Sequence, residues 1–575
     1  DHAHAGTPPL REGLTAMGTF GGILFTGQQA LLAHQTALQV SGQNIANANT
    51  PGYSRERAEL VSVPSSSTRI MRSGVYVEEI SRAYDRFITT QVAVASSNLT
   101  GTQTQADLLG QVEALFNDLN TPETGLSGAL EALFQGLHEL AQHPQGLSER
   151  SSVLQQGQNV AEAFHQLANG LQGLYQGRNA ELGDAVTDVN HLTTQLARLN
   201  LQIREREVDP KNHANTLRDQ QDLLLKQLAE KINITFFPTD AGQVTVLLGG
   251  GRPLVEGGQS FNLATRVDPD DPQRLLVDLN DAQGNGTDVT AQIRSGHIHG
   301  LLVGRDTVLP RLQASLDRLA AQLTTSLNQT HSTGYGLDGT TGQDFFVARQ
   351  VSGQALAANT GGGTVQSVSV FDPSQLTLDD YRLQFTSGGA QPTFDIVDAT
   401  TGTTVISGQN YTAGATFRFA GLAVTLADNG TPPQPGDTFL LRTTRKAAQN
   451  IAVAPTLLAH PRQVAAAQSL NPGDNANALA LAQLRDTLAM DGSTFGAFYH
   501  TLVTSVGAVS QQASRLADNQ QIVLTDLENR REALSGVSLD EEQVNLIRFQ
   551  QAYNAAANFI RIAEEIGQTV LDLVR

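Results

Sequence analysis

The stretch "SGQNIANANTPGYSRER", residues 41–57, ends an amphipathic segment abruptly. Before it, apolar residues recur every seven positions, at Leu24, Leu31, Leu38 and Ile45. This spacing is typical of a helix that presents a narrow apolar seam to another helix. Pro51 disfavours helical geometry at the residue before it, and Gly52 then allows the backbone to turn. The sequence therefore predicts a helix over residues 17–49 that stops at this turn.

The far end of the chain carries a second apolar stripe. Its members follow one another in steps of three and four, and Tyr553 and Ile560 widen it: Phe549, Ala552, Ala556, Phe559, Ala563, Ile566, Val570 and Leu573. Ser538 followed by Glu541 resembles a capping box, so we expect a helix over residues 538–575. Each terminal helix is marginal alone in water, whereas a pair buries both seams. A coiled coil of the two ends is one interpretation; two ordinary core helices of one globular domain are the other.

Between the ends, the apolar period changes several times, which predicts a nested multidomain α+β protein. We expect an unstructured or cloning-derived extension at 1–16, with Met17 as the natural start, and a helix with an extended hairpin arm at 17–84. A helical domain at 85–232 is completed by two later segments, and two mainly-β domains are inserted into it. The completing segments are 301–354 and 444–537, and the β inserts are 233–300 and 355–443.

The composition excludes several classes of function. The 575 residues carry a net charge of −19, which argues against nucleic acid or an anionic membrane as a partner. The absence of cysteine excludes disulfides and thiolate chemistry, and no apolar run is long enough to cross a bilayer. We also expect no cleavable signal peptide, because the early apolar clusters are separated by polar residues.

A search for catalytic or metal-binding patterns gives no strong candidate. "HELAQH" (138–143) separates His138 and His143 by five positions, whereas a zinc-binding helix needs four. In "HIHG" the pattern places His297 and His299 on one face of a strand, without a third ligand nearby. "GLDGTTGQD" (336–344) is expected to form a turn. We therefore expect no catalytic residue, cofactor or metal, and no enzyme activity.

The two terminal stretches resemble the bacterial flagellar axial proteins, the family of rod, hook and hook-associated proteins. "SGQNIANANTPGYSR" (41–55) is similar to their N-terminal signature, and "SGVSLDEEQVNLIRFQQAYNAAANFIRIAEEIGQTVLDLV" (535–574) to their C-terminal one. The long helical region at 85–232 and the passage "LNQTHSTGYGLDGTTGQDFF" (327–346) favour a protein of the hook–filament junction over a hook protein. The resemblance covers residues 17–575, and the two β inserts match in position and character.

This resemblance implies a structural protein of the extracellular flagellum, with no nucleic-acid partner and no membrane insertion. The terminal helices are then expected to form the inner layer of a ring or tubular homo-oligomer, and Tyr53 with its Pro-Gly turn leads into an arm that contacts neighbours. The implied partners are hook protein, the second junction protein (hook-associated protein 3), the flagellar type III export apparatus and an export chaperone. A hook or distal-rod protein remains an alternative, as does an exported enzyme or adhesin with activity in a β insert.

Overall fold

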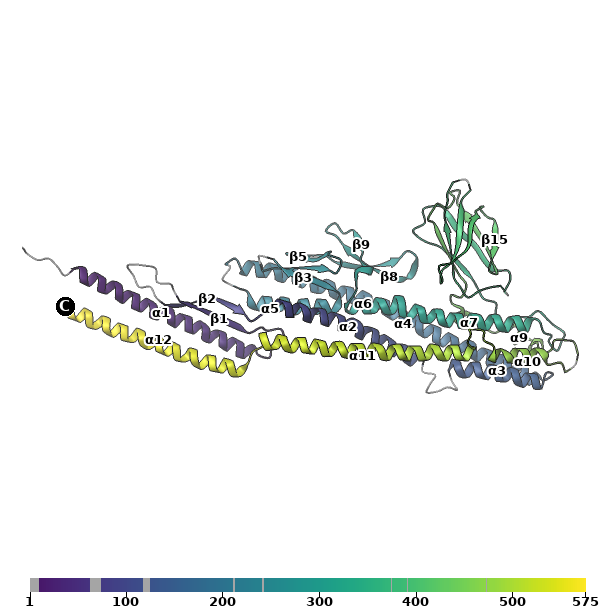
Figure 1. Ribbon diagram of the computed structural model, residues 1–575, viewed down its shortest axis with the longest axis horizontal. Helices are drawn as coiled ribbons and strands as arrows, with labels where there is room; N and C mark the ends of the chain where they lie inside the picture. Colours follow the sequence, from purple (N-terminus) through teal and green to yellow (C-terminus); the bar gives the residue numbers. More distant parts are fainter. Residues whose placement is uncertain are drawn as a thin grey trace, which may run out of the picture.

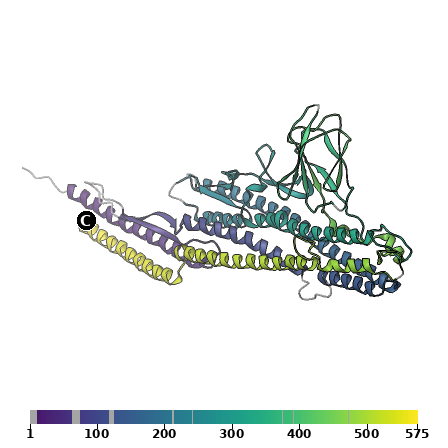
Figure 2. The same ribbon diagram turned by 45° about the vertical axis from the view of Figure 1, so that its right-hand side comes forward.

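The computed structural model describes residues 10–62, 74–116, 125–209, 213–239, 242–373, 375–389, 391–471 and 473–574. The molecule is elongated (Figure 1). A pair of terminal helices forms one end, a long helical body forms the rest, and two β modules stand on one side of that body (Figures 1 and 2). This multidomain α+β architecture confirms the expected fold class.

The terminal part contains two long helices and a hairpin. Helix α1 spans Leu10–Asn47 and packs along α12, Leu539–Val574. Strand β1, Glu56–Ser62, pairs antiparallel with β2, Val75–Arg82, and this hairpin contacts α1. Residues 10–16, expected to be unstructured, are already helical, while residues 1–9 of the expected extension lie outside the described residues.

The helical body is organised around α4, a helix of 60 residues, and its apolar stripes pack against neighbours on several sides. Large apolar side chains such as Phe164, Phe345 and Phe495 fill its main core. Its long helices are α2 (Arg86–Leu115), α3 (Leu126–Gln142), α4 (Leu147–Arg206), α5 (Asn215–Lys231), α7 (Leu309–Ser332) and α11 (Phe495–Ser535). Its short helices are α6 (Gly296–Val303), α8 (Ala447–Asn450), α9 (Pro455–Ala459) and α10 (Ala476–Gln483).

The first β module packs its apolar side on α4, α5 and α6. Its strands form a four-stranded sheet in the order β3-β4-β5-β6 and a three-stranded sheet in the order β7-β8-β9. Alternating side chains of β4, such as Val244, Val246 and Leu248, point into the core, as their period of two requires. The strands are β3 (Ile234–Pro238), β4 (Val244–Leu248), β5 (Pro253–Glu256), β6 (Gln259–Ser260), β7 (Leu263–Asp268), β8 (Asp271–Asn280) and β9 (Gly286–Asp288).

The second β module has its own aromatic core between two sheets. One sheet has the order β10-β17-β12-β13-β14, and the other has the order β11-β16-β15. Phe385 lies against Phe394, Tyr411 and Phe439. The strands are β10 (Ser352–Ala355), β11 (Gly363–Val370), β12 (Tyr381–Phe385), β13 (Thr393–Asp398), β14 (Thr404–Asn410), β15 (Thr416–Phe419), β16 (Leu422–Asp428) and β17 (Thr438–Arg442).

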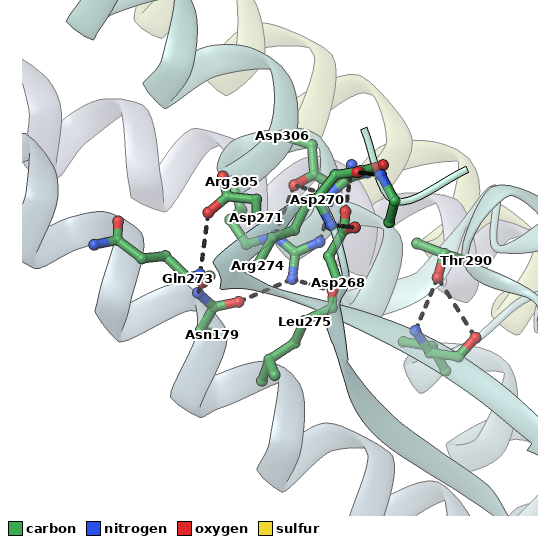
Figure 3. Close-up of polar contacts among 12 residues, drawn as sticks. Asn179, Asp268, Asp270, Asp271, Gln273, Arg274, Leu275, Thr290, Arg305 and Asp306 are labelled. Atoms are coloured by element: carbon green, nitrogen blue, oxygen red, sulfur yellow. Dashed lines mark hydrogen bonds and ion pairs between the residues drawn. The ribbon is translucent and has the colours of Figure 1, made fainter. Parts of the chain in front are cut away.

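A buried arginine fastens the first β module to the helical body (Figure 3). Arg305 lies in a π-helical turn, Gly304–Val308, between α6 and α7. Its guanidinium donates to both carboxylate oxygens of Asp306, to Asn179 Oδ1 of α4 and to the Leu275 carbonyl of β8. Because every terminal nitrogen has an acceptor, the buried charge is compensated. The contact holds three elements in register.

The two β modules also contact each other. Asp270 lies in the turn between β7 and β8 of the first module, beside the Arg305 cluster (Figure 3). Its Oδ1 accepts from the Ala357 amide at 2.6 Å, and its carbonyl oxygen accepts from Gln354 Nε2 at 2.5 Å. Gln354 lies in β10 of the second module, and Ala357 follows that strand. The modules are therefore linked by polar contacts as well as through the helical body.

One local expectation was wrong. The "HIHG" stretch forms the start of α6 and not a strand, so His297 and His299 lie about 200° apart around the helix. Gly296 adopts φ +85° and introduces this helix. At Gly300 an added Cβ would lie 2.6 Å from the Gly101 carbonyl oxygen of α2. The close approach of α2 and α6 explains why small residues occur here.

A candidate assembly site at the terminal helix pair

The contact between α1 and α12 includes small residues on both helices. Gly27 of α1 lies against α12, and Ala556 and Ala563 of α12 are buried. Small residues let two helix backbones approach closely. We call Gly27, Ala556 and Ala563 the small-residue seam. Ala33, Ala37 and Val40 of α1 are also buried, but they lie about 80–140° around the helix from Gly27.

The approach is tight along the pair. An added Cβ at Gly27 would lie only 2.6 Å from Ile560 Cγ1. Further along the seam, the rings of His34 and Phe549 lie 6.4 Å apart between centroids. Burial and the nearby Arg548 lower the pKa of His34. The imidazole is therefore held in its neutral form within an apolar interface.

The residues expected to mediate subunit contacts fall into three groups. Those buried in the small-residue seam are Ala556 and Ala563. Those half-buried beside it or in the following turn are Leu24, Leu31, Leu38, Ile45, Gly52, Tyr53, Phe549, Ala552, Tyr553 and Ile560. Those exposed are Pro51, Phe559 and Ile566, and the side chains of Val570 and Leu573 lie outside the described residues. The expected leucine stripe of α1 lies on the same side of the helix as Gly27 and His34, which contact α12.

A second apolar surface of α12 lies next to the face that packs on α1, and its Phe559 also borders Gly27. Its side chains are between 45% and 65% exposed: Val544, Ile547, Phe559, Ile562 and Ile566. At about 100° per residue, these five positions lie within about 120° of the helix circumference. We call them the outer ridge. Contiguous exposed apolar surface of this kind marks an interaction site.

The turn after α1 is held by one buried asparagine. Asn44 Oδ1 accepts from the Tyr53 hydroxyl and from the Glu56 amide, each at 2.9 Å, and Asn44 Nδ2 donates to the Glu56 carbonyl at 2.9 Å. Tyr53 N–H donates to the Thr50 carbonyl at 3.1 Å, closing a turn in which Gly52 adopts φ +83°. Burial, reinforced by Glu56, raises the pKa of Tyr53, so its hydroxyl remains protonated and able to donate.

The same turn is bound to the helical body through α5. Ser54 N–H donates to Asp219 Oδ2 at 3.0 Å. Arg82 at the end of β2 binds Asp219 at 2.7 Å and Asp222 at 2.9 Å, and its guanidinium lies 4.7 Å from the Tyr84 ring centroid. Burial opposes the charge on Arg82, but Asp222 and Asp219 outweigh it and raise the pKa of Arg82. The cation is therefore retained.

Arg55 joins this turn to the other end of the chain. Its Nε binds Glu542 at 2.7 Å and its Nη1 binds Glu541 at 2.7 Å, at the start of α12. The Arg55 amide donates to the Ser535 carbonyl, the last residue of α11. We call this network the joint, defined by Asn44, Tyr53–Glu56, Arg82, Asp219, Asp222, Glu541 and Glu542. It fixes how both terminal helices leave the helical body.

Several joint residues were not identified from the sequence. The acidic cluster at 540–542 is suited to a helix start, but two of its members also bind Arg55. Arg82, Asp219 and Asp222 gave no pattern, because their partners lie far away along the chain. The sequence signal for the joint was the N-terminal signature at 41–55, where Asn44, Tyr53 and Arg55 lie close together.

The histidine patterns show no shared ligand geometry. His297 contacts Thr104 Oγ1 at 2.9 Å and Glu181 at 3.3 Å, whereas His299 Nδ1 contacts the Ile293 carbonyl at 3.0 Å. In the part of the chain that the structure describes, no three His, Cys, Asp or Glu residues are grouped to hold a metal ion. Within those same ranges, no helix is both long and apolar enough to cross a membrane.

Three family descriptions match parts of the chain in the order of the fold. "Flagellar hook-associated protein FlgK helical domain" matches residues 109–346. "Flagella basal body rod protein" matches residues 24–53, and "Flagellar basal body rod FlgEFG protein C-terminal" matches residues 532–573. The terminal matches therefore coincide with α1 and α12, and the central match with the body and first β module.

Full-length relatives agree with these matches. "Flagellar hook-associated protein 1" of Salmonella typhimurium LT2 is 29% identical over 554 residues, covering 94% of this chain and 98% of the relative. This chain is similar to flagellar hook-associated protein 1 over nearly its whole length. The protein of the same name from Bacillus subtilis 168 is 27% identical and covers 96% of this chain and 98% of its own length.

A solved structure supports the fold of the hook-associated protein 1 family for this chain. It is titled "The structure of the flagellar hook junction protein FlgK from Burkholderia pseudomallei". It aligns with a TM-score of 0.66 at 22% identity, covering 77% of this chain and all of the solved chain.

Proposed function

We propose that this chain is a non-enzymatic structural component of the bacterial flagellum, located at the junction of hook and filament. Its similarity to hook-associated proteins over nearly their whole length supports this role. The two ends of the chain carry the matches shared with rod proteins, and these ends form the helix pair. The task of the protein is then to pack against neighbours.

The observation that carries the proposed assembly is the outer ridge. Within one chain, the small-residue seam already buries one face of α12 against α1. The ridge adjoins this contact but stays largely exposed, so a further surface is required to cover it. We assign that surface to neighbouring copies in a ring or tubular homo-oligomer. Hook protein and the second junction protein, hook-associated protein 3, adjoin the assembly at its two ends.

A groove on the body provides a further apolar surface. It lies between α2 and α11, has a volume of about 470 Å³ and is lined by residues that include Phe87, Val94 and Val523. Each of these three side chains is exposed. Lateral contacts between copies then involve the helical body as well as the terminal pair.

Delivery to the cell exterior is proposed to use the flagellar type III export apparatus, assisted by an export chaperone. Export of this kind threads an unfolded or readily unfolded chain. The sequence has no cysteine, so no disulfide opposes unfolding. The joint that holds the ends together consists of hydrogen bonds and ion pairs, which re-form after passage.

Substitutions in the outer ridge test the proposal. Ile547→Glu and Ile562→Glu place charges on the surface assigned to neighbours, so we expect a folded monomer that no longer enters the flagellum. Gln550→Glu, at an exposed position outside the ridge, is the matched control and should assemble normally. Circular dichroism checks the fold, and electron microscopy with motility assays checks assembly. Normal motility with both ridge variants would contradict the proposal.

A further inference from the structure

Arg349, in the segment between α7 and β10, has a charged group without a partner. Both of its terminal guanidinium nitrogens are shielded from solvent, and neither has a hydrogen-bond acceptor. Burial lowers the pKa of Arg349 to about 10, and no carboxylate offsets this effect. Leaving a cation buried and unpaired opposes folding.

Other buried arginines in the described residues have acceptors for their terminal nitrogens. Arg305 binds Asp306, Asn179 and a backbone carbonyl, and Arg82 binds two aspartates. Arg150 donates from Nη1 and Nη2 to the carbonyls of Val464 and Pro144. In the described ranges, Arg349 is the arginine for which both terminal nitrogens are buried and unpaired. Packing alone does not explain this arrangement.

Arg349 lines a cleft of about 320 Å³ between α7 and the second β module. Four polar side chains of α7 in this cleft already make hydrogen bonds. Thr325 donates to the Ala321 carbonyl, Gln329 to the Pro373 carbonyl and Ser332 to the Gln329 carbonyl. Asn328 exchanges two hydrogen bonds with the backbone of Phe346. The guanidinium is thus the donor in the cleft that still needs an acceptor.

We propose that this cleft is a binding site for a carboxylate, which pairs with the guanidinium of Arg349. A planar carboxylate offers two oxygens to the two terminal nitrogens, the strongest common geometry for arginine. No hydrogen bond restrains these nitrogens, so turning them toward the cleft breaks no bond. Asp344 and Asp372 also line the cleft and repel an anion, and they repel a doubly charged phosphate more strongly than a singly charged carboxylate.

The carboxylate comes either from a free acid or from an Asp or Glu side chain of a second copy. The chain carries 56 acidic against 37 basic residues, so any copy presents many carboxylates. The inference holds for isolated protein and does not depend on the role at the flagellar junction. The two sources are distinguishable in one experiment.

The test uses the full-length chain labelled with ¹⁵N-arginine, with the Nε–Hε signal of Arg349 assigned by its loss in Arg349→Met. N-acetyl-glutamate N-methylamide is the probe, and its glutamine counterpart is the uncharged control. We expect the signal to shift with the glutamate probe and not with the glutamine probe. Isothermal titration should show binding about tenfold weaker in Arg349→Met. A shift that instead follows protein concentration without probe assigns the carboxylate to a second copy.

A thermal measurement separates binding from a structural role. Arg349→Met removes an unpaired buried charge, so we expect the isolated variant to melt at a higher temperature than the parent chain. Arg382→Met, at an exposed position of β12, is the matched control and should change neither melting nor binding. If the Arg349 signal responds neither to the glutamate probe nor to protein concentration, the proposal is overturned, whatever the melting result.

Discussion

At the scale of single residues, Asn44 has the largest effect on how the chain leaves α1. Its short amide side chain satisfies the Tyr53 hydroxyl and both backbone groups of Glu56. An asparagine offers an acceptor and two donors on one rigid group, which suits this position better than an aspartate. The Asn-rich signature therefore encodes a specific turn and not merely a polar loop.

Asn44→Ala should destabilise the protein by about 1–3 kcal/mol, because it leaves several buried polar groups without partners. Urea unfolding followed by circular dichroism measures this change. Asn49→Ala is the matched control, since Asn49 is exposed within the same signature, and it should change stability by less than about 0.5 kcal/mol. Equal effects of both substitutions would contradict the proposed role of Asn44.

A second residue, His331, should make stability depend on pH. It is fully buried near the end of α7, where Nε2 accepts from the Ala465 amide and Nδ1 donates to the Gln343 carbonyl at 2.6 Å. Burial lowers the pKa of His331 to about 4. The unfolded chain therefore takes up this proton near pH 6.5 and the folded chain does not, so stability is lost as pH falls from 6.5 toward 4.

We expect this histidine to reduce the free energy of unfolding by about 2 kcal/mol between pH 7 and pH 5. His331→Gln should be less stable at pH 7 but should lose that part of the pH dependence. His138→Gln, at an exposed position, should keep the pH dependence of the parent chain. Urea midpoints of the three proteins at both pH values are the measurement. Parallel pH profiles for all three would rule out His331 as the source.

At the scale of elements, α1 and α12 depend on close approach and not on large side chains. The small-residue seam allows the backbones to come near, and Gly27 marks the tightest point against Ile560. Larger residues of α12 pack opposite the small or polar residues of α1, Ile560 at Gly27 and Phe549 at His34. The packing of α1 on α12 therefore depends on the volume of the side chains as well as on their apolar character.

Two glycine substitutions in α1 test this account. Gly42→Ala meets no atom within 4 Å and should stabilise the helix by about 1 kcal/mol through its higher helix propensity. Gly27→Ala has the same propensity gain but must displace Ile560, so it should loosen the pair. Hydrogen exchange of α1 amides, slower in the first variant and faster in the second, checks the prediction. Equal protection in both would show that α12 does not restrict position 27.

Much of the element pattern was predictable from apolar periodicity. The seven-residue spacing of Leu24, Leu31, Leu38 and Ile45 correctly indicated a helix that packs on a partner. It did not indicate that Gly27 lies closest to α12, because glycine carries little signal in an apolar pattern. The period-two runs around Val246 and Val277 likewise correspond to β4 and β8.

The joint was much less predictable. A hydrogen bond such as that of Ser54 to Asp219 joins residues 165 positions apart, and no local spacing encodes it. The "HIHG" stretch failed for a related reason, since alternation over four residues does not distinguish a strand from the first turn of a helix. Tertiary packing of α6 on α2 decided that outcome.

At the scale of the whole molecule, the two ends of the chain lie side by side and the domains are nested between them (Figure 1). The main core of the body includes neither α1 nor α12. The terminal pair and the body are therefore connected chiefly by the joint and by the chain itself. This separation assigns folding to one part and assembly to the other.

Deleting residues 540–575 should leave the body and both β modules folded and soluble, because their cores lie elsewhere. The same deletion should abolish incorporation into the flagellum, since it removes the outer ridge. Thermal unfolding of the purified truncated protein and electron microscopy of flagella provide the two readouts. Normal incorporation of the truncated chain would refute the assembly role of the terminal pair.

The pairing of β10 with β17 has a consequence for how this family diversifies. Ser352 lies opposite Arg442, so the second β module enters and leaves the body through neighbouring strands. Adjacent strands lie only about 5 Å apart, and a short linker spans that distance. This module can therefore be exchanged, by evolution or by engineering, for another domain whose termini lie close together. The replacement would be displayed on the surface without changes to the helical body.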